Sequence, residues 1–123
     1  MIKILIADDN PVILSTLRKI ITAQADFQIV CEATGGIQAL ELVKAHLEEI
    51  NIVVLDVNMP DMHGLEVLIT LRKNYPKLPV LMLSGFSDSN YSSKCMKEGA
   101  AAFIGKEDAS DLLPNTIRRI VTG

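Results

Sequence analysis

Short apolar runs alternate with longer amphipathic segments along the 123 residues of this chain. The apolar runs lie at residues 2–7, 27–31, 50–55, 80–83 and 101–104. Most of them are unbroken rather than alternating, which is typical of strands that are covered on both faces, as in a parallel sheet. The pattern therefore predicts a buried parallel sheet.

Between these runs, apolar residues recur three or four positions apart, which places them on one stripe of a helix. The predicted stripes are Ile13, Leu17 and Ile20; Ile37, Leu40, Val43 and Leu47; Leu65, Leu68 and Leu71; and Leu113, Ile117, Ile120 and Val121. A further helix is predicted at residues 87–98, so that helices alternate with strands. Right-handed crossovers then place helices on both faces of the sheet, which predicts a doubly wound α/β fold.

Two of these helices have unusual sequences. The first half of segment 87–98 is polar and has low helix propensity, so this helix should be the least firmly anchored element. Gly99 is expected to end it. In the last helix, Pro114 is tolerated without loss only in the first turn, which predicts a helix start near Ser110 or Asp111.

Composition adds limits on the class of protein. The length and the 49% of hydrophobic residues suit one domain over residues 1–123. The net charge of −3 and the scattered basic residues argue against strong nucleic-acid binding by this chain alone. Cys31 and Cys95 are expected to be reduced. No run approaches a membrane span, and the first apolar run is too short for a secretory signal, so we expect a soluble, cytoplasmic protein.

Polar side chains follow four of the predicted strands. Asp8 and Asp9 follow the first, Asp56 ends the third, Ser84 ends the fourth and Lys106 follows the fifth. The carboxyl ends of parallel strands meet at one edge of the sheet, where such folds bind ligands. Three carboxylates at this edge repel one another unless a cation or protons compensate, and oxygen ligands of this kind favour Mg²⁺.

The same residues suit phosphoryl transfer to a side chain. Asp56 is the candidate nucleophile, because a carboxylate that faces Mg²⁺ can attack phosphorus while the metal neutralises charge on the phosphoryl group. Lys106 could pair with one phosphoryl oxygen and Ser84 could donate to another. Taken singly, such residues are more often helix caps, turn formers or solvated side chains. Their joint occurrence at the strand ends favours the functional interpretation.

The motifs around these residues resemble the response-regulator receiver family, the CheY-like domains of two-component systems. They cover the whole chain: ILIADDNP at 4–11, VVLDVNMP at 53–60, HGLEVL at 63–68, LSG at 83–85 and GAAAFIGK at 99–106. The resemblance implies a flavodoxin-like (βα)5 fold with a five-stranded parallel sheet in the order 2-1-3-4-5. It also implies a phosphoacceptor regulatory domain rather than an enzyme that acts on an external substrate.

Residue by residue, the resemblance implies a phosphorylation site that depends on Mg²⁺. Asp56 would be phosphorylated and would also contact the metal. Asp9 would bind Mg²⁺ directly, Asp8 directly or through water, and Asn58 through its backbone carbonyl. Lys106 would contact the phosphoryl group.

The resemblance also implies a switch and partners. Ser84 would be the switch hydroxyl and Phe103 the aromatic side chain that turns on activation, changing the surface of the fourth helix, the fifth strand and the last helix. The phosphoryl donor would be a sensor histidine kinase or a phosphotransfer protein. A second hypothesis, based on its position two residues after Ser84, is that Phe86 shields the phosphoryl group from attacking water.

Several positions depart from the common family pattern. Gly85 stands where Ala is frequent. Glu107 stands where Pro is frequent, so no cis peptide bond is implied there. His63 replaces a frequent Asp, and we expect it to be an exposed turn residue. The runs at 9–11 and 106–108 resemble the NarL/FixJ-type subgroup, whose full-length members carry a C-terminal helix-turn-helix domain. We therefore expect an N-terminal fragment of a longer transcription regulator that reaches DNA only through that domain, with homodimer formation on phosphorylation left open.

Other functions stay open at this point. An aspartyl-nucleophile phosphatase normally has a second acid two residues after the nucleophile, where this chain has Asn58. A flavin-binding protein of similar fold needs a phosphate loop after the first strand, where Asp8 and Asp9 would repel phosphate. A stand-alone receiver that acts by protein contact, or a degenerate one, is the remaining alternative.

Overall fold

Five parallel strands form one sheet in the computed structural model, which describes residues 1–85 and 90–123. The strands are β1 (Ile2–Ala7), β2 (Phe27–Ala33), β3 (Ile52–Asp56), β4 (Val80–Ser84) and β5 (Ala102–Gly105). Their order in the sheet is β2-β1-β3-β4-β5. The predicted flavodoxin-like fold class is therefore confirmed, with strand ends within two residues of the predicted runs.

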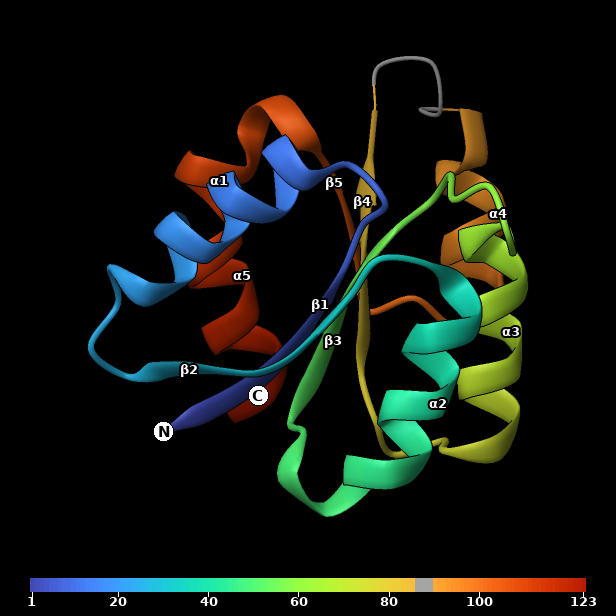
Figure 1. The fold of residues 1–123 in the computed structure, drawn as a ribbon, viewed down its shortest axis with the longest axis horizontal. Coiled ribbons are helices and arrows are strands. Elements are labelled where there is room, and N and C mark those ends of the chain that lie inside the picture. Colours follow the sequence, from blue (N-terminus) through green and yellow to red (C-terminus); the bar gives the residue numbers. More distant parts are fainter. Residues whose placement is uncertain (86–89) are drawn as a thin grey trace.

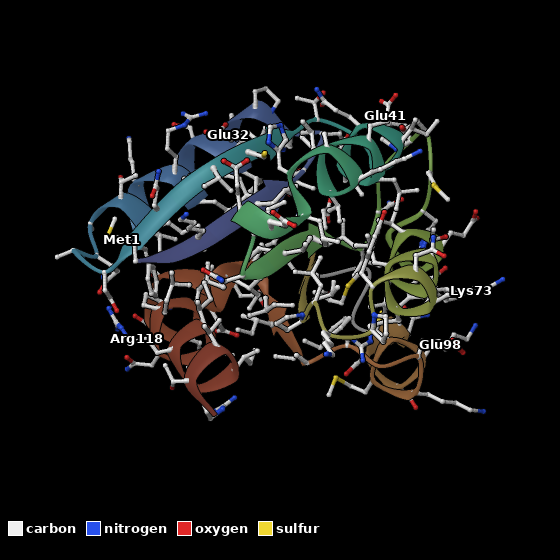
Figure 2. The ribbon with its side chains drawn as sticks, turned by 90° about the horizontal axis from the view of Figure 1, so that it is seen from below. Met1, Glu32, Glu41, Lys73, Glu98 and Arg118 are labelled. Carbon is white, nitrogen blue, oxygen red and sulfur yellow. The ribbon has the colours of Figure 1, made fainter. Side chains whose placement is uncertain are left out.

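Helices cover both faces of the sheet (Figure 1). Helices α1 (Pro11–Thr22) and α5 (Ala109–Thr122) lie on one face, and α2 (Gly36–His46), α3 (Gly64–Asn74) and α4 (Ser92–Lys97) lie on the other. The buried side chains form two matching clusters, one on each side of the sheet. Figure 2 shows the same layering from below, with Arg118 of α5 and Lys73 of α3 on opposite sides of the molecule.

The two central strands explain why the apolar runs are unbroken. Every residue of β3 and of β4 is buried, because each strand has neighbouring strands at both edges and helices over both faces. Burial continues to the last residue of each strand, and these last residues are Asp56 and Ser84. The fold thus places two buried polar side chains at the carboxyl edge of the sheet.

Two predicted helix boundaries differ from the structure. Helix α5 begins at Ala109, slightly before the predicted start, so Pro114 lies inside the helix rather than in its first turn. The carbonyl that loses its partner to Pro114 belongs to Ser110, which is exposed and accessible to water. Helix α4 covers residues 92–97 of the predicted 87–98 segment. Phe86 and residues 87–89 lie outside the described residues.

The predicted buried stripe of α2 is partly wrong. Ile37 is 53% exposed and Leu47, which lies beyond the helix in the 3-10 turn η1 (Leu47–Glu49), is 38% exposed. The residues of α2 that are buried are Gly36, Ala39 and Val43. Their small side chains let the helix backbone lie close to the sheet, which turns the larger Ile37 outward.

Both cysteines are free, as expected, and both are buried. Gly99 follows α4 with φ of +99°, a left-handed conformation that favours glycine, which confirms it as the helix stop. Within residues 1–85 and 90–123, no helix combines the length and the apolar character that crossing a bilayer requires.

Candidate functional site

Three carboxylates meet at the carboxyl edge of the sheet. Asp8 and Asp9 follow β1, Asp56 ends β3, and these two strands are neighbours. One carboxylate oxygen of each residue lies within 4.8 Å of the others. Asp8 and Asp56 are almost completely buried, whereas Asp9 is exposed. The structure therefore brings together the acidic residues that the sequence predicted to be close.

Lys106 compensates part of this negative charge. It begins the 3-10 turn η3 (Lys106–Asp108) directly after β5, at the same edge of the sheet. Its Nζ lies 2.9 Å from Oδ2 of Asp8 and 3.1 Å from Oδ1 of Asp56. Burial works against the charged amine, but the two carboxylates outweigh burial and raise the pKa of Lys106. The ammonium thus stays charged and holds two buried acids together.

The carboxyl group of Asp56 has a pKa close to neutral pH. The pKa of Asp56 is raised from 3.8 to about 6, mainly by burial and secondly by the charge of Asp8. The charge and hydrogen bond of Lys106 oppose this effect, as does the N–H of Asn58. The ionised form of Asp56 is therefore costly in the folded protein, and a second cation would favour it.

The surroundings of Asp8 fit a hard divalent cation. Oδ1 of Asp8 accepts a hydrogen bond of 2.8 Å from the N–H of Asn10. Oδ2 is buried beside Lys106 and has no hydrogen bond of regular geometry within the described part of the chain. A buried carboxylate oxygen with spare lone pairs, next to two other carboxylates, is the type of donor set that Mg²⁺ accepts. The residues present therefore fit a Mg²⁺ site.

Asn58 lies two residues beyond Asp56, between the buried side chains of Val57 and Met59. Its N–H is 3.4 Å from Oδ1 of Asp56, which is a long hydrogen bond. The role of its backbone carbonyl as a metal ligand stays a prediction.

Ser84 and Phe103 lie beside each other at the same edge. Ser84 is 2% exposed, and its hydroxyl donates a hydrogen bond of 2.8 Å to the carbonyl of Gly85. Phe103 is half-buried on β5, and both residues line one groove together with Ser92 at the start of α4. The hydroxyl of Ser84 is thus engaged locally, and it must leave the Gly85 carbonyl before it can donate elsewhere.

Gly64 and His63 hold the loop that follows Asp56. The N–H of Gly64 donates a hydrogen bond of 2.6 Å to the carbonyl of Val57, and a Cβ at Gly64 would collide with the carbonyl oxygen of Asp56.

The prediction that His63 is an exposed turn residue is wrong. His63 is half-buried, its Nδ1 accepts a hydrogen bond of 3.2 Å from Leu65 at the start of α3, and its ring centroid is 4.8 Å from that of Tyr91.

Sequence reasoning missed the role of Asp61, whose carboxylate caps helix α2. It accepts hydrogen bonds from the N–H groups of Gly36 and Ile37. The sequence carried one indirect signal, because Gly35 and Gly36 begin a helix without a capping side chain of their own.

Comparison with known proteins gives matches over the whole chain. The family model described as response regulator receiver domain matches residues 4–118. The glycerol metabolism activator of Pseudomonas putida is 35% identical over 123 residues, which are 100% of this chain and 55% of that protein. The transcriptional regulatory protein DegU of Brevibacillus brevis is 30% identical over 99% of this chain and 51% of that protein.

Solved structures agree with these matches. A chain in the crystal structure of the CheX–CheY–BeF3–Mg²⁺ complex from Borrelia burgdorferi is 28% identical, with a TM-score of 0.89 over 97% of this chain and 88% of that chain. The present chain spans about half the length of the curated relatives named above.

Proposed function

Because this chain belongs to the response regulator receiver domain family, we propose that it is a phosphoaspartate switch of a two-component system, with Asp56 as the phosphorylated residue. The observation that carries the proposal is the buried carboxylate of Asp56 at the strand end, within 4.8 Å of carboxylate oxygens of Asp8 and Asp9 and 3.1 Å from Nζ of Lys106. One nucleophile, a place for one metal and one cation for the phosphoryl group are what phosphoryl transfer to a carboxylate requires.

In the proposed reaction, a carboxylate oxygen of Asp56 attacks the phosphorus of the donor. A P–O bond forms to Asp56, and the bond from phosphorus to the donor breaks, with its electron pair leaving on the donor. The side chains of Asp8, Asp9 and Asp56 and the carbonyl of Asn58 would hold Mg²⁺, which supplies charge neutralisation for the incoming oxygens when bound.

The remaining site residues would stabilise and report the phosphorylated state. Lys106 would exchange its ion pairs with the carboxylates for a contact with a phosphoryl oxygen. Ser84 would exchange the carbonyl of Gly85 for another phosphoryl oxygen, and Phe103 would turn into the space that this movement frees. The groove between Ser84, Phe103 and Ser92 supports this proposal, because it joins the phosphorylation edge to α4.

The partners follow from the family and its relatives. We propose a sensor histidine kinase or phosphotransfer protein as the phosphoryl donor, and a cytoplasmic location. The matched regulator named above is described as a transcriptional regulator about twice the length of this chain. We therefore propose transcription as the output, through a further DNA-binding domain, with dimer formation as one route of activation. The chain itself would act as a regulatory phosphoacceptor rather than on an external substrate.

The test is phosphorylation of the purified protein by acetyl phosphate with MgCl₂, followed by the mass of the intact chain. We expect one added phosphoryl group in the wild type, and none in Asp56→Asn or when EDTA removes the metal. The same assay distinguishes the proposed function from both alternatives. A phosphatase would release the phosphate without keeping it, and a degenerate receiver would gain no mass. An unmodified wild-type chain that is folded would refute the proposal.

A further inference from the structure

The loop that carries Asn58 is tied to a helix that precedes it in the sequence. The carboxylate of Asp61 accepts hydrogen bonds of 2.9 Å from the N–H of Gly36 and 3.1 Å from the N–H of Ile37. These are first-turn donors of α2 that have no partner within the helix. The bonds lower the pKa of Asp61, in agreement with a carboxylate bound by two N–H groups at a helix N-terminus.

The start of α2 is shaped to receive this carboxylate. The N-cap residue, Gly35, has no side chain to cap the helix, and a Cβ there would lie 2.9 Å from both carboxylate oxygens of Asp61. A Cβ on Gly36 would lie 2.8 Å from the backbone carbonyl of Met62. The two glycines therefore let the loop lie directly against the helix end, and Asp61 supplies the cap that they lack.

This contact holds the outer half of the loop after Asp56. The inner half is fixed by the buried side chains of Val57 and Met59. Residues 60 and 61 are exposed, and among the hydrogen bonds of the described residues those of Asp61 tie segment 58–63 to a distant part of the chain. Asn58 thus lies in a loop with one buried anchor and one hydrogen-bonded anchor.

We infer that Asp61 is a positioning residue for the phosphorylation site. Its clamp on α2 holds the backbone of the loop so that the carbonyl of Asn58 faces the metal position beside Asp56. The inference rests on the proposed function, because it concerns the metal that this function needs. Loss of the clamp leaves the carboxylate ligands in place and disorders the loop that carries the backbone ligand, so Mg²⁺ affinity falls while the fold persists.

The experiment measures Mg²⁺ binding to the metal-free chain by calorimetric titration with MgCl₂ at constant ionic strength. We expect Asp61→Ala to raise the Kd for Mg²⁺ about tenfold, which is typical when a residue that supports metal ligands is removed. Asp61→Asn removes the charge but keeps an oxygen that can accept one of the two bonds, so it should recover most of the affinity. The phosphorylation rate of Asp61→Ala should approach the wild-type rate at saturating MgCl₂.

Asp26→Ala is the matched control. Asp26 is also an exposed aspartate that accepts two hydrogen bonds from a distant segment, both of 2.9 Å from Arg118. It lies just before β2, at the amino edge of the sheet and away from the phosphorylation site. Asp26→Ala should lose stability without a change in Kd.

Equal Kd values for the Asp61→Ala and Asp26→Ala variants would overturn the inference. Equal weakening by Asp61→Ala and Asp61→Asn would also overturn it, because the charge of Asp61 rather than its clamp would then set the affinity. A wild-type protein that binds no Mg²⁺ and gains no phosphoryl group would instead overturn the proposed function on which the inference rests.

Discussion

Replacing the buried carboxylate of Asp56 with an amide should stabilise the metal-free protein at neutral pH. Burial, and then the charge of Asp8, raise the pKa of Asp56 from 3.8 to about 6 in the folded chain. Each pKa unit that separates the folded from the unfolded value is worth about 1.4 kcal/mol. Ionised Asp56 therefore lowers the free energy of unfolding by about 3 kcal/mol, and Asp56→Asn removes this loss.

The pH dependence fixes the sign of the effect. Below pH 3.8 the carboxyl group is protonated in both states, so Asp56→Asn should change stability little. Between pH 3.8 and about 6 the unfolded chain releases the proton of Asp56 and the folded chain keeps it. The contribution of Asp56 to stability then falls by about 1.4 kcal/mol per pH unit, and above that window the loss is constant. The advantage of Asp56→Asn should therefore grow from pH 4 to 6 and then level off.

Urea unfolding in EDTA across this pH range would measure the effect, and thermal melting would show it as roughly 10 °C at neutral pH. Asp9→Asn is the matched control, because it removes the same charge from an exposed member of the cluster and should stay within about 0.5 kcal/mol. MgCl₂ should stabilise the wild type and have little effect on Asp56→Asn. Parallel stability curves for Asp56→Asn and wild type from pH 4 to 8 would refute the reasoning.

Two further substitutions test the packing and the charge of the site. Gly64→Ala should destabilise the fold by about 3 kcal/mol in urea unfolding, since its Cβ would collide with the carbonyl of Asp56; a change below about 0.5 kcal/mol would show that the loop relaxes freely. Lys106→Met should lower the stability of the metal-free protein at pH 7 by about 3 kcal/mol, because two buried carboxylates lose the ammonium 2.9 Å and 3.1 Å away. MgCl₂ should recover more stability in this variant than in the wild type, and an equal gain would contradict the electrostatic explanation.

The parts of the site that the sequence could predict depend on strand ends. Unbroken apolar runs indicate buried parallel strands, and parallel strands end at one edge, so the order of residues places Asp8, Asp9 and Asp56 at the same edge of the sheet. Their proximity follows once the strand order implied by the family resemblance makes the first and third strands neighbours. The same reasoning placed Lys106 after β5, where its Nζ reaches two of the carboxylates. These contacts are set by the sheet topology, which leaves little freedom.

The parts that could not be predicted depend on contacts between loops and helix ends. Asp61 looks like an ordinary turn residue in the sequence. Its role depends on the N–H groups at the start of α2, which begins 25 residues earlier in the chain. His63 likewise caps α3 by accepting the N–H of Leu65, and its ring contacts that of Tyr91, the residue directly before α4. Hydropathy also misplaced Ile37, because the small side chains of α2 rather than its largest ones determine which face approaches the sheet.

Lys106 links the electrostatics of the carboxylate cluster to the proposed output. Its Nζ forms ion pairs with Asp8 and Asp56, so the carboxylates as well as β5 determine its position. Its backbone lies between Gly105, the end of β5, and η3, which leads directly into α5. A phosphoryl group on Asp56 would compete with Asp8 for the same ammonium. Phosphorylation removes the negative charge of the Asp56 carboxyl group and places a larger negative charge on the phosphoryl oxygens. Any movement of Lys106 toward these oxygens would act on the junction of β5 and α5. The residue that compensates the charge of the buried acids would therefore also transmit the phosphorylation of Asp56 to the surface.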